Sequence, residues 1–182
     1  MSRFFPHPPY AEDQPLHHTI LTTHVLTRGF TTGAIIGSLI SASRYILSPA
    51  RRQQPLAYLA SRLLASSSTG ALVGVGLSAL ATVGRMYGRE EIEWRDRSWR
   101  LLENEGQLET DDWTYAGMVA APAVLAAATR GAAAPLGWRA VVGASGLGSI
   151  AGMLGYMTWR YGINGGKFPG SAGTREAKEI AE

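Results

Sequence analysis

The histidines of this chain, a residue type used widely in acid–base chemistry and metal binding, all lie near its N-terminus. They are His7, His17, His18 and His24, and no further histidine is present to complete a zinc-binding set with them. The chain contains no cysteine, which excludes disulfides, thiolate metal ligation and thiol nucleophiles. We therefore expect the histidines to be polar groups at a surface or membrane interface, and we expect no metal site.

Carboxylates gather in residues 85–112, where nine acidic residues are interleaved with five arginines. In three places an acid precedes an arginine by four residues, which is the favourable order for an ion pair on a helix. These pairs are Glu91 with Arg95, Glu93 with Arg97, and Asp96 with Arg100. We interpret the acids as members of solvated ion pairs rather than as a metal or acid–base site. The segment predicts an amphipathic helix that lies on a membrane surface or against a partner and ends near Gly106.

Two segments match the pattern G-x-G-x-x-A, which occurs in dinucleotide-binding folds. They are residues 74–79 and 146–151. A dinucleotide site needs a strand immediately before the glycines and a helix that opens at them. Here the glycines lie inside continuous apolar stretches whose small residues recur at helical spacing. We therefore interpret both segments as helix-packing faces, and we expect neither a nucleotide cofactor nor catalysis.

Four apolar, nearly uncharged stretches dominate the chain, and each is bounded by charged residues. They lie between Arg28 and Arg44, Arg62 and Arg85, Asp112 and Arg130, and Arg139 and Arg160. A helix that spans a bilayer needs about 20 apolar residues. The sequence therefore predicts an all-α membrane protein with about four transmembrane helices, over residues 21–47, 56–84, 113–130 and 138–160. We expect Asp111 or Asp112 to cap the third helix.

Small residues fill these stretches, and the chain has 22 glycines and a mean hydropathy of only −0.01. Several glycines recur at a spacing of four, which places them on one helix face where two backbones can approach closely. The expected packing residues are Gly29, Gly33 and Gly37, then Gly70 and Gly74, then Gly148 and Gly152. We expect the first two helices to form a close antiparallel hairpin and the weakly apolar helices to need neighbouring proteins.

The organisation of the chain follows from this pattern. Residues 1–15 are rich in proline and predict an extended segment, residues 16–161 a transmembrane domain with an interfacial segment over 85–112, and residues 162–182 a tail. The N-terminus lacks the apolar core of a secretory signal and the character of a mitochondrial presequence, so we expect no cleaved leader. Basic residues form no long run, which argues against nucleic-acid binding despite the net charge of +3.

Charge patterns leave the orientation in the membrane open. The two short loops carry arginines without nearby acids, whereas the other side carries more basic residues in total but also many acids. A bare count of Lys and Arg therefore favours one orientation, and the local density of these residues favours the opposite one. We favour the short basic loops facing the more negative compartment. For Arg28, Arg44 and Arg130, at the span ends, we expect snorkelling or a lipid phosphate partner.

Two segments resemble a known family. They are EIEWRDRSWRLLENEGQLETDDWTYAG at residues 91–117 and HHTILTTHVLTRGFTTGAIIGS at residues 17–38. Both resemble a fungal-type accessory subunit of mitochondrial respiratory complex I, the NADH:ubiquinone oxidoreductase, over roughly residues 16–165. The four-span layout is also similar to the Tim17/Tim22/Tim23 family. The chain departs from that signature at Arg89, four residues after Arg85, where the family has an acid.

The resemblance implies a non-catalytic subunit of the inner-membrane arm, which holds other membrane-arm subunits and lipids in place and binds no small-molecule substrate. The acid-free loop residues Arg51, Arg52 and Arg62 are candidate contacts for the phosphates of a phospholipid such as cardiolipin. Two other classes remain open. A protein-translocase subunit would use similar glycine faces, and a small solute carrier would show similarity between the two halves of the chain.

Overall fold

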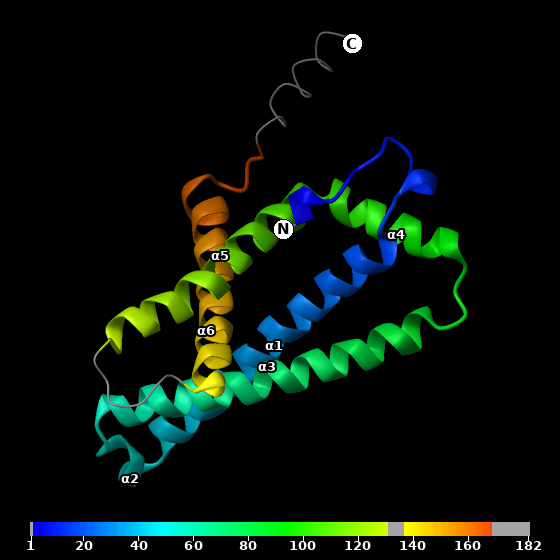
Figure 1. Cartoon of the computed structure of the whole chain (residues 1–182). Coiled ribbons are helices and arrows are strands. Elements are labelled where there is room, and N and C mark those ends of the chain that lie inside the picture. The colour runs from blue at the N-terminus through cyan, green and yellow to red at the C-terminus, as the bar shows by residue number, and fades with distance from the viewer. Residues whose placement is uncertain (1, 131–136, 169–182) are drawn as a thin grey trace.

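The fold is entirely helical over the part of the chain that the structure, a computed structural model, describes, namely residues 2–130 and 137–168 (Figure 1). The α-helices are α1 His17–Leu47, α2 Pro49–Arg52, α3 Leu56–Met86, α4 Glu91–Glu103, α5 Glu105–Ala128 and α6 Trp138–Met157. Two single turns of 3₁₀-helix, Ser2–Phe4 and Ala11–Asp13, precede α1, and a π-helical turn, Thr158–Ile163, continues α6. The expected all-α class is confirmed.

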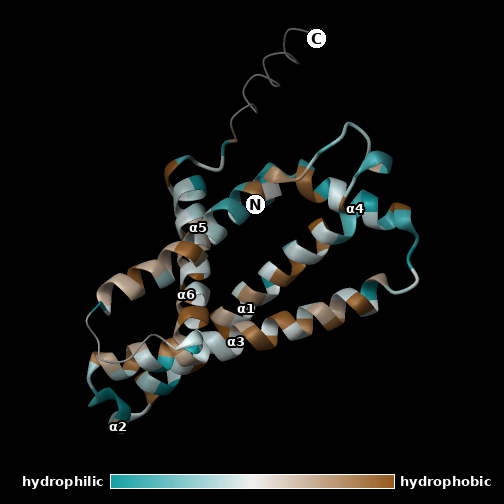
Figure 2. Ribbon diagram, in the orientation of Figure 1, coloured by the Kyte–Doolittle hydropathy of each residue, from teal (hydrophilic) through white to brown (hydrophobic). Residues whose placement is uncertain are grey.

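Three helical segments are long and apolar enough to cross a membrane: His17–Leu47, Leu56–Met86 and Trp138–Ile163. Apolar residues run along α3 for most of its length, whereas α2 and α4 are largely hydrophilic (Figure 2). The fourth expected span, residues 113–130, corresponds to the second part of α5, which is not among these three segments. A polar first part, which includes Glu105, Glu109 and Asp111, lowers the mean hydropathy of this helix.

Helices α1 and α3 form a close antiparallel hairpin through their glycine faces. The chain leaves α1 at Ser48, because Pro49 disfavours helical geometry in the residue before it. Pro49 begins the short helix α2, and Pro55 is the residue just before α3. A Cβ atom on Gly33 would overlap the carbonyl oxygen of Gly70, and one on Gly74 would overlap that of Gly29. The two backbones therefore touch directly, as the spacing of four predicts.

The second close pair is formed by α5 and α6, with α6 also lying against the α1–α3 hairpin (Figure 1). Gly148 of α6 meets the backbone of Gly117 on α5, and Gly152 meets the backbone of Trp113. On another side of α6, Gly143 contacts the backbone of Leu64 on α3. Small residues thus let α6 approach two helices at backbone distance, and the helix becomes the centre of the packing.

The interfacial segment, residues 85–112, has a different helix boundary from the one that the sequence predicts. Its helix, α4, ends at Glu103, and Gly106 lies inside the next helix instead of ending the first. The break is at Asn104, whose side-chain oxygen accepts a hydrogen bond from the backbone N–H of Gln107 at 3.1 Å and so caps α5. Asp111 and Asp112 lie in the second turn of α5 and beyond, so neither caps a helix.

The N-terminal segment lies on α4 over its described residues. Trp99 donates its indole N–H to the carbonyl oxygen of Pro8 at 2.9 Å, and Arg95 donates to that of Glu12 at 2.6 Å. The side chain of Gln14 is buried and donates to the carbonyl oxygen of Pro6. The expected tail, residues 162–182, falls mostly outside the described residues.

The hairpin predicts a sharp contrast between two glycine-to-alanine substitutions. At Gly33 of α1 a methyl group would meet the backbone of Gly70, whereas at Gly76 of α3 it would meet nothing within 4 Å. We expect Gly33→Ala to destabilise the detergent-solubilised protein by about 1–3 kcal/mol, because overpacking forces the helices apart. Gly76→Ala should leave it unchanged or slightly more stable, because alanine favours helix.

Thermal unfolding of the two variants, followed by circular dichroism in the same mild detergent, measures this contrast. Equal stability of Gly33→Ala and Gly76→Ala would contradict direct backbone packing between α1 and α3.

Candidate functional site

Basic side chains converge where α1, α2 and α3 meet. A small pocket there is lined by Arg44 from the last turn of α1, Arg51 from α2 and Arg62 from α3, together with the rings of Tyr45 and Tyr58. None of the ion pairs within the described residues joins these arginines to a carboxylate. Guanidinium groups match phosphate oxygens in charge and geometry. The pocket would therefore attract a phosphate group at its mouth, because its interior, about 10 Å³, holds little more than one water molecule.

Of the three arginines that the sequence analysis names as candidate phosphate contacts, two line this pocket. Arg51 and Arg62 lie together in the pocket, whereas Arg52, the last residue of α2, does not line it. Arg44, which the sequence reasoning treated separately as a residue at a span end, takes the third place. Helix α1 carries it there because Ser41, Arg44 and Tyr45 lie at spacings of three and four on one face.

A buried carboxylate joins α1 to α5 at the other end of α1. Asp111 is 1% exposed, and its two oxygens lie 2.8 Å from a guanidinium nitrogen of Arg28 and 3.1 Å from Nδ1 of His24. Arg28 also donates to the side-chain oxygen of Gln107, and the hydroxyl groups of Thr27 and Tyr115 are 2.9 Å apart. Arg28 therefore has a carboxylate partner within the chain, which corrects the expectation of snorkelling or a lipid phosphate.

A second buried ion pair joins α5 to the end of α6. The guanidinium of Arg160, in the π-helical turn, donates two hydrogen bonds to the carboxylate of Glu109, one of them at 2.9 Å. Its carbon lies 4.7 Å from the ring centre of Trp159 and 4.6 Å from that of Phe168. A bidentate pair flanked by two aromatic rings holds the end of α6 firmly against α5.

The first half of α5 thus collects basic groups from three other segments. Asp112 forms an ion pair with Arg3 of the N-terminal segment, and this hydrogen bond raises the pKa of Arg3. We call Glu109, Asp111 and Asp112 the acidic junction. Loss of one partner of a buried pair leaves an uncompensated charge, so the junction fixes how α1, α5 and α6 are placed relative to one another.

The four histidines face carboxylates, although the sequence reasoning treated them as unspecialised polar groups. His7 lies 2.8 Å from Glu103, His17 lies 2.8 Å from Glu91, and His24 contacts Asp111 as described above. His18 lies 3.7 Å from the second oxygen of Glu91. Glu91 therefore turns toward α1 instead of pairing with Arg95. Of the three ion pairs expected within α4, the structure forms Asp96 with Arg100, whereas Glu93 pairs with Arg89.

The two G-x-G-x-x-A segments lie well inside α3 and α6, and no strand occurs in the described ranges. Gly74 and Gly148 are both used for helix contacts. This context agrees with the packing interpretation and argues against dinucleotide binding. The sequence reasoning missed Gly117, which meets Gly148, because no second glycine repeats at its spacing in α5.

The sequence matches the model of one known protein family over most of its length. Residues 12–155 match the model of a family described as a protein of unknown function, DUF1757. The match covers most of the chain, from within the second 3₁₀ turn to near the end of α6, so the chain belongs to this family. No curated protein matches the sequence.

Proposed function

We propose that this DUF1757 family member is a non-catalytic accessory subunit of mitochondrial NADH:ubiquinone oxidoreductase, and that it stabilises or assembles the membrane arm in the inner membrane. The proposal starts from the resemblance of residues 17–38 and 91–117 to such a subunit. In the fold these two segments contact each other through His17 with Glu91, Arg28 with Asp111, and Thr27 with Tyr115. The resembling residues therefore form one connected region of the molecule.

The observation that carries the proposal is the exposed apolar surface of α3. Only 17% of the most apolar 18-residue stretch of this helix is buried inside the molecule. Leu77, Leu80 and Val83 are each more than 60% exposed, and the glycine face of the same helix is turned to α1. A helix rich in small residues gains little from lipid alone. Such a surface suits packing against the apolar helices of a larger membrane complex.

The structure supports a fourth span formed by the second part of α5. This part runs antiparallel to α6 through the contacts of Trp113 with Gly152 and Gly117 with Gly148. Because α6 is itself long and apolar enough to cross a bilayer, its close partner would cross the same layer. The acidic junction would then lie near one membrane face. The arginine pocket and the start of α6 would lie at the opposite face, which we assign to the more negative compartment.

The arginine pocket fits an additional role in binding lipid. Three guanidinium groups that have no acidic partner among the described residues lie where two spans end, which is the depth at which phospholipid headgroups occur. We propose that a phosphate group of an anionic phospholipid such as cardiolipin occupies it. A subunit that holds such a lipid would bind other subunits partly through the acyl chains.

A translocase subunit of the Tim17/Tim22/Tim23 type is the alternative, because glycine faces of this kind also occur in that layout. The basic residue at Arg89 weighs against it, and in the structure Arg89 forms an ion pair with Glu93. Co-migration with translocase components would support this alternative.

Co-migration tests the proposal directly. A tagged copy of the chain, solubilised from mitochondria in digitonin and resolved by native electrophoresis, should migrate with the band that stains for NADH dehydrogenase activity. The Gly76→Ala variant should migrate in the same way, whereas Gly33→Ala should shift toward a free pool because its hairpin is loosened. A wild-type chain found only free, or with translocase components, would contradict the assignment.

Single-cysteine labelling tests the number of spans. The chain has no native cysteine, so only the introduced one reacts with the label. With four spans, Ala50→Cys after α1 and Gly137→Cys before α6 face the same compartment, and Glu90→Cys faces the other. With α5 lying on the surface, the cysteine at 137 would share its side with the one at 90. We expect a membrane-impermeant maleimide to label positions 50 and 137 together in sealed vesicles and to leave position 90 unlabelled, or the reverse.

Lipid analysis tests the arginine pocket. We expect the double variant Arg51→Ala, Arg62→Ala to lose at least half of the anionic phospholipid that copurifies with the wild-type protein, because two of its three phosphate ligands are gone. Arg52→Ala is the matched control, since this neighbouring arginine does not line the pocket. Equal lipid content in the double variant and the control would count against the site.

A further inference from the structure

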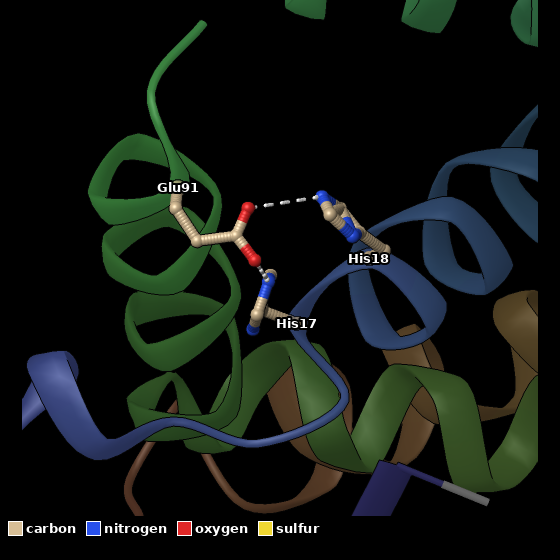
Figure 3. Close-up of side chains that lie close together, drawn as sticks. All are labelled: His17, His18 and Glu91. Atoms are coloured by element: carbon tan, nitrogen blue, oxygen red, sulfur yellow. Dashed lines mark hydrogen bonds and ion pairs between the residues drawn. The ribbon is translucent and has the colours of Figure 1, made fainter.

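We propose that His17, His18 and Glu91 bind one divalent transition-metal ion of the zinc and copper class. The two histidines begin α1 and the glutamate begins α4, so the site would join two helices that are distant in sequence. Figure 3 shows both imidazole rings turned toward the two oxygens of the same carboxylate. One ligand atom from each residue lies within 4.8 Å of the other two.

The distances suit ligands of a common ion. Nε2 of His17 lies 2.8 Å from one oxygen of Glu91, and Nε2 of His18 lies 3.7 Å from the other. Nitrogen and oxygen ligands of a tetrahedral zinc ion lie about 2.0–2.2 Å from the metal, which places them about 3.4 Å from one another. The observed separations bracket this value, so small rotations of the side chains close the set around an ion.

The second nitrogen of His17 is already engaged in the manner typical of metal-binding histidines. Nδ1 lies 3.0 Å from the backbone carbonyl oxygen of Gln14, which can only accept, so Nδ1 carries a proton and donates it. In the neutral ring the lone pair of Nε2 then points at the carboxylate of Glu91. That contact needs either a second proton on the ring or a metal ion between the two groups. A carbonyl that holds the distal N–H of the ring is a common second-shell partner of ligating histidine.

His18 distinguishes a metal site from a simple ion pair. A proton on His17 alone would satisfy its contact with Glu91, but it would give His18 no role. The ring of His18 is held edge-on against Trp94, with centres 4.4 Å apart, and this contact keeps its nitrogen directed toward the same carboxylate. His18 and Glu91 are both more than half exposed, so an ion and completing water molecules can enter.

The chemistry of the donor set selects the class of ion. Two imidazole nitrogens and one carboxylate oxygen suit zinc, copper and nickel, whereas calcium and magnesium prefer sets made of oxygen. The bound ion would tie the start of α1 to the start of α4. The isolated chain would bind the ion, whichever membrane complex contains it.

Titration of zinc chloride into the full-length protein, purified in detergent without a polyhistidine tag, tests the site. We expect one zinc ion per chain, and at least tenfold weaker binding in His18→Gln and in Glu91→Gln. His7→Gln is the matched control, because His7 is also paired with a glutamate, Glu103, outside the cluster. Copper(II) loaded at one equivalent should show coupling to two imidazole nitrogens in electron paramagnetic resonance, reduced to one in His18→Gln.

Three results would overturn the inference. They are the absence of stoichiometric zinc binding by the wild type, equal binding by His18→Gln and the wild type, and a loss in His7→Gln as large as the loss in His18→Gln. Each can occur whether or not the chain co-migrates with NADH dehydrogenase activity, so failure of this site is distinguishable from failure of the proposed function.

Discussion

Direct contact between helix backbones is the constraint on which the rest of this structure depends. Two long apolar helices that meet through leucine or isoleucine would remain too far apart for their main chains to touch. Here the carbonyl oxygens of one helix lie against the α-carbons of the next. This occurs at Gly33 and Gly74 in the pair α1 and α3, and at Gly117 and Gly148 in the pair α5 and α6. Lipid supplies no hydrophobic force between helices, so stability comes from the van der Waals contact that such an approach allows. The low mean hydropathy of the chain is the cost of this arrangement.

Glycine faces alone do not select one register, and the acidic junction removes that ambiguity. A repeat of small residues every four positions permits two helices to slide by about one turn, about 5.4–6 Å, and to meet small residues again. A slide of that size would separate Asp111 from Arg28 and His24, and Glu109 from Arg160, and would strand buried charges. Buried ion pairs at one end of the bundle thus specify the register between helices that the glycine packing alone leaves open.

The sequence predicts the features that depend on local spacing and misses those that depend on contacts between distant residues. The hairpin of α1 and α3 follows from glycines four residues apart and from Pro49 and Pro55. The pairing of Arg28 with Asp111 joins residues that are far apart in sequence, and nothing near Arg28 signals it. The sequence prediction ends the helix near Gly106, because a glycine is a common end signal. The structure places the break at Asn104, two residues earlier, where the side chain caps α5.

The same long-range contacts explain why the metal and lipid candidates lie where they do. Along α1, the sixteen residue steps from Arg28 to Arg44 correspond to about 24 Å of helix, which is most of the thickness of a bilayer core of about 30 Å. At the Arg28 end, Arg28 and His24 contact Asp111 of α5, and His17 contacts Glu91 of α4. At the Arg44 end no described carboxylate reaches the arginines. The proposed lipid phosphate would therefore bind at the Arg44 end, where the arginines of the pocket have no carboxylate partner among the described residues.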